Sequence, residues 1–155
     1  MSPPRIGEPA PDFELPATGD RQIRLADLRG RIVVLYFYPR DDTPGCTTEA
    51  IDFRDRASEF AAAGACVLGV SRDDLKSHER FRQKHDLEFD LLADTDEVVC
   101  NTWDVIREKN LYGKQVRGIE RSTFLIDAGG ILRREWRGVK VPGHVDEVLA
   151  ATREL

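Results

Sequence analysis

Residues 31–49 read RIVVLYFYPRDDTPGCTTE, a run in which an apolar segment passes directly into the start of a helix. The first part, Arg31–Tyr38, is almost entirely β-branched or aromatic, which is typical of a central strand covered on both faces. Thr43 and Pro44 then supply a preferred N-cap and a preferred first helical residue. The stretch therefore predicts a strand that ends just before a helix, with Cys46 in the first turn of that helix.

Strands and helices alternate along the rest of the chain. We expect further strands at 13–15, 23–25, 65–71, 89–92, 122–126 and 131–136, and helices at 44–63, at 73–84, from Asp94 with Glu97 as a capping box, and from Pro142. A turn signal at 127–130 joins the last two strands as a hairpin. This order predicts an α/β fold in which helices flank a mixed central β-sheet, a three-layer sandwich compatible with a thioredoxin-like fold.

Length, charge and hydropathy limit the classes of function. The chain has 155 residues, which we interpret as one domain, 1–155. Its formal net charge of −5 argues against a nucleic-acid partner or an anionic membrane surface. The N-terminal residues contain no apolar signal segment, and the longest apolar run, Ile32–Tyr38, is too short to span a bilayer.

Cysteine usage points to reactivity. The chain has three cysteines, an odd number, and no two of them form a CxxC pair. This pattern does not suggest a secreted disulfide framework, a zinc ribbon or a dithiol of the thioredoxin type. We therefore expect a cytoplasmic protein in a reducing compartment, in which an important cysteine acts through its thiol chemistry.

Cys46 is the candidate for that chemistry. The free N–H groups and the dipole at a helix N-terminus favour the thiolate form of a cysteine in the first turn. Gly45 leaves room beside it for a close approach. Fast reaction also needs groups that stabilise charge on a leaving atom, such as a guanidinium or the Thr43 hydroxyl. The alternative is that Cys46 is a small buried hydrophobe.

These residues resemble a known family. Pro39-x-x-x-Thr43-x-x-Cys46 resembles the peroxidatic signature of the peroxiredoxins, and YFYPRDDTPGCTTEA resembles the peroxiredoxin Q subfamily, also called bacterioferritin comigratory proteins. GEPAPDFELP, DFRD, VLGVS, FDLLAD and RSTFLIDAGG extend the resemblance in order over nearly the whole chain. It implies a thioredoxin-like fold and an antioxidant peroxidase that reduces hydrogen peroxide and organic hydroperoxides without a metal or an organic cofactor.

The resemblance also implies roles for single residues. Cys46 matches the peroxidatic cysteine, which becomes a sulfenic acid, and Thr43 matches the residue that orients thiolate and peroxide. Pro39 matches the residue that shields the site, and Arg121 matches the active-site arginine, although from the residues alone Arg121 is equally a surface charge at a strand edge. Glu49 follows Cys46 by three residues, where an unpaired carboxylate would oppose the thiolate. The family pairs this glutamate with arginine; the alternative is an ordinary exposed glutamate.

The cysteine that would reduce the sulfenic acid is not evident. Many peroxiredoxin Q proteins carry a resolving cysteine five residues after the peroxidatic one, where this chain has Ile51. Cys66 lies in an apolar strand, and Cys100 lies near Trp103, so both read as packing residues. We therefore expect a one-cysteine cycle with thioredoxin, glutaredoxin or a low-molecular-weight thiol as reductant. A Cys46–Cys100 disulfide and an intermolecular disulfide are the alternatives.

Two other classes of function remain open from the sequence. One is a redox sensor or relay in which oxidised Cys46 acts on a protein partner, and the other is a binding module with an inert thiol. Arg121, Thr43 and Pro39 around one thiol favour the enzyme. The resemblance favours a monomer, and the scattered histidines His78 and His85, flanked by charged residues, suggest solvent exposure and no metal site.

Overall fold

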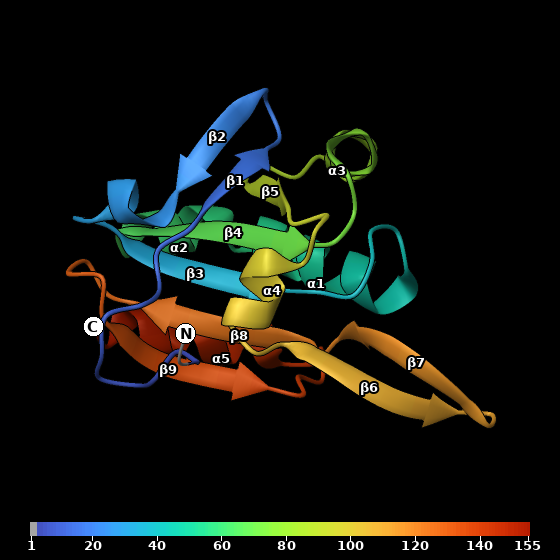
Figure 1. Ribbon diagram of the computed structural model, residues 1–155. Coiled ribbons are helices and arrows are strands. Elements are labelled where there is room, and N and C mark those ends of the chain that lie inside the picture. The colour runs from blue at the N-terminus through green and yellow to red at the C-terminus, as the bar shows by residue number, and fades with distance from the viewer. Residues whose placement is uncertain (1–2) are drawn as a thin grey trace.

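The structure is a computed structural model that describes residues 3–155, so the first two residues of the expected domain lie outside the described range. Within that range seven strands form one mixed sheet in the order β2-β1-β5-β4-β3-β8-β9 (Figure 1). The strands are β1 (Glu14–Ala17), β2 (Arg21–Arg24), β3 (Ile32–Phe37), β4 (Ala65–Ser71), β5 (Asp90–Ala93), β8 (Ser122–Ile126) and β9 (Leu132–Arg137). Their positions follow the predicted strands closely.

The central strand is β3, as residues 31–38 predict. It runs parallel to β4, with Val34 opposite Val67, and antiparallel to β8, with Val34 opposite Leu125. Alternate side chains of β3 enter two different cores: Leu35 and Phe37 on one face of the sheet, and Val34 and its alternating neighbours on the other. Burial of both faces explains why the strand is apolar throughout.

Helices cover both faces of the sheet. The helices α1 (Pro44–Asp55), α2 (Ala57–Ala62), α3 (Leu75–Lys84) and α5 (His144–Arg153) contribute Phe53, Phe60, Phe81 and Val148 to one core. The short helix α4 (Val98–Thr102) and the 3-10 turn η1 (Leu25–Leu28) contribute to the other core (Figure 1). This arrangement confirms the predicted α/β three-layer sandwich of thioredoxin-like type. No helix among residues 3–155 has the length and apolar character needed to cross a bilayer.

The helix expected over residues 44–63 is in fact two helices. Arg56 interrupts it with φ −105° and ψ 7°, and α2 begins at the next residue. The apolar pattern conceals this break because Phe53 and Phe60 lie on opposite sides of it and still pack together, with ring centroids 5.8 Å apart. Periodicity alone cannot detect a one-residue interruption that leaves the buried face continuous.

The capping box expected at 94–97 is wrong. Asp94 accepts a hydrogen bond from the backbone N–H of Cys100 at 2.7 Å. It therefore satisfies a free N–H group in the first turn of α4, although Glu97 and not Asp94 is the N-cap residue. Glu97 adopts a left-handed backbone with φ 65° and pairs with Arg72 and Arg117. Two arginines from other elements draw the Glu97 side chain away from the helix end.

A hairpin that the sequence did not reveal lies outside the main sheet. It consists of β6 (Ile106–Leu111) and β7 (Lys114–Ile119) and projects beyond the sheet (Figure 1). Most of its side chains are exposed, so it lacks the alternation of apolar and polar residues that marks a half-buried strand. The hairpin leads the chain back to Arg121 at the entrance to β8.

Candidate active site

Cys46 lies where the sequence predicts, in the first turn of α1 just beyond the carboxyl end of β3. Thr43 is the N-cap residue, with extended backbone angles of φ −98° and ψ 155°, and Pro44 is the first helical residue. Cys46 is only 2% exposed and packs against the core that contains Ala50 and Phe53. The thiol therefore combines a helix N-terminus with near-complete exclusion from water.

Arg121, the residue immediately before β8, reaches this thiol. The residue after it, Ser122, pairs with Phe37, so the register of β8 against β3 places Arg121 beside the point where the chain leaves β3 for α1. One guanidinium nitrogen, Nη2, lies 3.5 Å from Cys46 Sγ, and the other, Nη1, donates to Glu49 Oε1 at 2.7 Å. The structure thus brings together three of the predicted site residues, and a single cation bridges the thiol and the carboxylate.

Glu49 is completely buried beneath the guanidinium. Burial raises the pKa of its carboxyl from 4.5 to about 7, against the opposing effects of the Arg121 charge and hydrogen bond. The second carboxylate oxygen, Oε2, has no hydrogen-bond partner among the described residues. Glu49 is therefore not the exposed first-turn glutamate that the sequence left open, and its charge depends on pH near neutrality.

A Glu49→Gln variant should change how the free energy of unfolding depends on pH. Because the folded-state pKa is raised, the contribution of Glu49 to stability is fully present below about pH 4.5 and is lost as the pH rises through about 7. Relative to Glu49→Gln, the native chain should lose on the order of 3 kcal/mol across this window. Urea unfolding at pH 4.5 to 8 measures the difference. Glu88→Gln, at an exposed position, is the matched control, and parallel pH profiles for all three proteins would contradict the prediction.

Gly45 provides the space that the guanidinium occupies. A Cβ added at this position would lie 3.1 Å from Arg121 Nη2, closer than an ordinary contact. The backbone of Gly45 is helical, so the requirement is for space rather than for a left-handed conformation. The sequence predicts room here for a substrate or the backbone; the structure fills that room with Arg121.

Gly45→Ala should therefore slow the reaction of the Cys46 thiol with peroxide that the resemblance implies, without unfolding the protein. The added methyl group displaces the Arg121 head group from Cys46, and we expect the rate constant to fall about tenfold, as small misplacements of reacting groups commonly cause. Alanine favours helix over glycine by up to ~1 kcal/mol, so stability should stay the same or rise. Stopped-flow kinetics and urea unfolding measure the two effects. An unchanged rate would show that the Arg121 position does not depend on Gly45.

Thr43 and Pro39 lie in the segment between β3 and α1, as the sequence predicts. The Thr43 hydroxyl donates to the carbonyl oxygen of Arg40 at 2.9 Å, so it makes no hydrogen bond to the helix that it precedes. Pro39 is half-buried and follows Tyr38, the first residue after β3. Their expected roles, orienting and shielding the thiolate, remain predictions.

The other two cysteines lie away from Cys46. Cys100 belongs to the core on the opposite face of the sheet, where it packs with Trp103 and is completely buried. Cys66 lies near the start of β4 opposite Val33, whereas Cys46 follows the far end of β3. Burial raises the pKa of both the Cys66 and the Cys100 thiols, and the neighbouring Asp94 raises that of Cys100 further.

Comparison with known proteins identifies the family. The AhpC/TSA family profile matches residues 6–135. Peroxiredoxin Bcp from Xanthomonas campestris is 53% identical over 147 residues, which cover 94% of this chain and 92% of that protein. The chain belongs to the peroxiredoxin Bcp, or peroxiredoxin Q, subfamily. As a peroxiredoxin it is a thiol-dependent peroxidase, which confirms the resemblance seen in residues 36–50.

Solved peroxiredoxin structures agree with this assignment. Xanthomonas campestris peroxiredoxin Q superimposes with a TM-score of 0.88 at 52% identity, over 92% of this chain and 90% of that one. A peroxiredoxin Q variant from Xylella fastidiosa gives a TM-score of 0.93 at 42% identity, over 99% and 98% of the two chains. The thioredoxin-like fold is therefore that of the subfamily over almost its full length.

Proposed function

We propose that this peroxiredoxin reduces hydrogen peroxide and organic hydroperoxides through Cys46 in a one-cysteine cycle. The observation that carries the proposal is the contact of 3.5 Å between Arg121 Nη2 and Cys46 Sγ at the first turn of α1. A guanidinium cation and a helix N-terminus both lie at this sulfur, where they are available to stabilise negative charge on a departing oxygen.

The first step is a displacement at oxygen. The Cys46 thiolate attacks the terminal oxygen of ROOH, the O–O bond breaks, and Cys46 becomes a sulfenic acid while RO⁻ leaves. The leaving oxygen takes a proton to give water or an alcohol. Arg121 and the N–H groups of the first turn of α1 stabilise the negative charge as it develops.

Organic hydroperoxides are part of the proposed substrate range. Alkyl peroxide reduction activity is attributed to the Xanthomonas campestris bacterioferritin comigratory protein, whose structure is 51% identical to this chain with a TM-score of 0.88. This relative supports substrates larger than hydrogen peroxide.

An external thiol completes the cycle. Structures of the Xanthomonas protein include serine variants of two cysteines, the second 36 residues after the first. The residue 36 positions after Cys46 in this chain is Arg82, and the residue five positions after it is Ile51, so neither position holds a thiol. Cys100 lies on the opposite face of the sheet. A disulfide needs Cα atoms within ~7 Å, so a Cys46–Cys100 bond would require local rearrangement of at least one helix, which supports the one-cysteine cycle.

Reduction then requires two external sulfhydryl groups. The first attacks the sulfenic acid to form a mixed disulfide with loss of water, and the second releases Cys46 as the oxidised reductant leaves. Because Cys46 is 2% exposed, the first turn of α1 must open before a thiol can reach it. Thioredoxin, glutaredoxin or a low-molecular-weight thiol can serve in a reducing compartment such as the cytoplasm, and the cycle needs no second subunit, in keeping with a monomer.

Turnover in the cysteine variants tests this cycle. Cys66→Ser and Cys100→Ser should consume peroxide within about twofold of the native rate, since neither thiol takes part. Assays with thioredoxin, glutaredoxin and glutathione, each with its reductase, measure the rates and identify the reductant. A disulfide that mass spectrometry finds in the native chain and not in Cys100→Ser would contradict the one-cysteine cycle. Oxidation that stops at one equivalent with every reductant would favour a redox sensor.

A further inference from the structure

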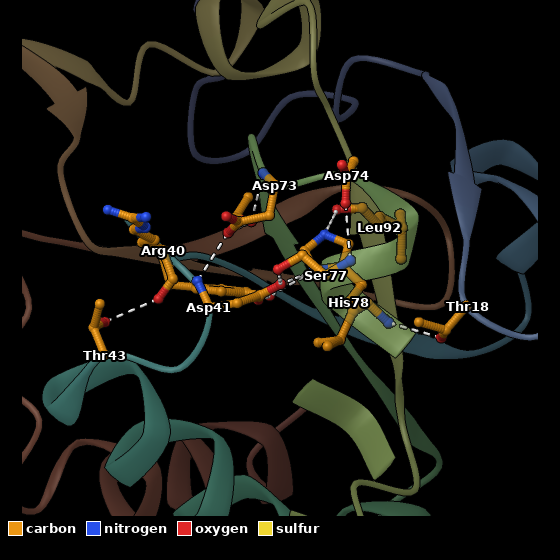
Figure 2. Close-up of polar contacts among 12 residues, drawn as sticks. Thr18, Arg40, Asp41, Thr43, Asp73, Asp74, Ser77, His78 and Leu92 are labelled. Atoms are coloured by element: carbon orange, nitrogen blue, oxygen red, sulfur yellow. Dashed lines mark hydrogen bonds and ion pairs between the residues drawn. The ribbon is translucent and has the colours of Figure 1, made fainter. Parts of the chain in front are cut away.

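A buried carboxylate lies in the loop between β3 and α1. The Asp41 side chain is 3% exposed, and three groups approach its two oxygens. The Tyr38 hydroxyl donates to Oδ1 at 2.6 Å, the Ser77 hydroxyl donates to Oδ2 at 2.8 Å, and the ring of His78 contacts Oδ2 at 2.7 Å. Figure 2 shows Asp41, Ser77 and His78 meeting between the loop and α3.

His78 is completely buried, so the expectation that it is exposed to solvent is wrong. Its Nδ1 faces Asp41 Oδ2, and its Nε2 lies 2.9 Å from the carbonyl oxygen of Leu92 in β5 (Figure 2). The carbonyl oxygen of Leu92 can only accept a hydrogen bond, so Nε2 donates to it, and one proton is shared between Nδ1 and Asp41 Oδ2 in the other hydrogen bond. The buried ring of His78 therefore ties α3 to Asp41 on one side and to β5 on the other.

The backbone of the loop is held as well. The N–H of Asp41 donates to Asp73 Oδ2 at 2.8 Å, and the Ser71 hydroxyl donates to the same oxygen at 2.6 Å. The candidate ligand atoms of Asp41, Asp73 and His78 lie within 4.8 Å of one another. Hydrogen bonds already satisfy them, so the cluster fastens the loop and does not need an ion to do so.

This fastened loop leads directly to the reactive thiol. Asp41 precedes the N-cap residue Thr43 by two residues, and the Thr43 hydroxyl is bound to the carbonyl of Arg40, next to Asp41 (Figure 2). Cys46 follows in the first turn of α1, whereas Arg121 immediately precedes β8. The distance between Sγ and the guanidinium therefore depends on where the loop sets the start of α1.

We propose that His78 is a positioning residue for the peroxidatic reaction: its buried hydrogen bond with Asp41 holds the start of α1 so that Cys46 faces Arg121. The inference rests on the proposed function of Cys46. It predicts that the contact of His78 with Asp41 matters for the peroxide step, whereas the contact with Leu92 matters only for stability.

Two substitutions separate the two contacts. In His78→Asn the amide nitrogen takes the place of Nδ1 and can still donate to Asp41, and in His78→Gln it takes the place of Nε2 and can still donate to Leu92. We expect His78→Gln to react with hydrogen peroxide about tenfold more slowly than the native chain, and His78→Asn to stay within about threefold of it. Urea unfolding of both variants shows how much stability each has lost.

A second, independent readout is which step of the cycle becomes slower, the attack on peroxide or the reduction of the sulfenic acid. A displaced start of α1 slows the attack on peroxide but not the reduction of the sulfenic acid, which requires this turn to open. Stopped-flow measurement should therefore show an unchanged or faster reduction step in His78→Gln. Equal peroxide rates in the two variants, or rates that follow only their stabilities, would overturn the inference.

A milder variant keeps the test decisive if the His78 variants fail to fold. Ser77→Ala removes one donor to Asp41 at a half-buried position, and we expect its peroxide rate to fall about threefold. Ser58→Ala, at an exposed position on α2, is the control. A native rate in Ser77→Ala would overturn the inference. A native chain that itself reacts slowly with peroxide would instead refute the proposed function.

Discussion

Cys46→Ser should reduce the peroxidase activity to the rate measured without protein. A serine hydroxyl is almost entirely un-ionised near neutral pH, and oxygen cannot form the sulfenic acid through which the cycle passes. The substitution replaces sulfur by a smaller oxygen at a buried site, so the fold should persist. Peroxide consumption with an excess of thiol reductant measures the loss, which we expect to exceed ~10³-fold.

The two other cysteines provide the controls. Cys66→Ser and Cys100→Ser place the same substitution at a half-buried and at a completely buried thiol elsewhere in the sheet. If Cys46→Ser retained more than a small fraction of the native activity while folded, the peroxidatic role of Cys46 would be refuted. If either control lost activity without losing stability, a second thiol would belong to the cycle.

Arg121→Met should lower the rate constant for the peroxide reaction by about 10²–10³-fold. This is the usual effect of removing one group that stabilises charge developing in a transition state. Methionine keeps much of the side-chain length but removes the cation that lies 3.5 Å from Cys46 Sγ. Stopped-flow measurement with hydrogen peroxide gives the rate constant directly, before any reductant is involved.

Loss of Arg121 also leaves the buried carboxyl of Glu49 without its partner, which complicates a single substitution. The double variant Arg121→Met/Glu49→Gln removes both charges and restores a neutral site. We expect it to recover stability but not the rate. Arg121→Lys keeps the charge but lacks a planar fork that contacts both partners, so its rate should lie between those of the other variants. A double variant with the native rate would show that Arg121 serves the fold rather than the reaction.

Much of the fold could be predicted because local signals and packing agree. The run of residues 31–38 is apolar on both faces because β3 is buried on both faces, and the Thr43-Pro44 pair starts α1 where its residue types favour a start. The hairpin of β6 and β7 could not be predicted, because packing against the core imposes no pattern on its residues. Both of its faces are largely exposed, so its sequence carries little periodic signal.

The site was only partly predictable from its residues. Cys46 stands out because helix-start signals are local, but Arg121 lies 75 residues further along the chain. The register of β8 against β3 brings it to the thiol, and only the family resemblance singled it out. Burial of Glu49 is likewise a consequence of this pairing, which no local pattern around residue 49 encodes.

His78 shows that charged neighbours in the sequence do not establish that a helical residue is exposed to solvent. Charged residues flank it, which suggested exposure, yet it precedes Phe81 by three residues and shares the buried face of α3 with it. Spacing of this kind is the signal that would have found it. Its partner Asp41 comes from a loop whose path the sequence does not specify.

The number of thiols lost per peroxide tests the central claim most directly. The chain has three cysteines, and in the one-cysteine cycle a single equivalent of hydrogen peroxide oxidises Cys46 alone. After the sulfenic acid is trapped with dimedone and the protein is denatured, titration should find two free thiols and one dimedone adduct on the peptide that contains Cys46. One free thiol and no adduct would show that an internal disulfide forms, and would contradict the account.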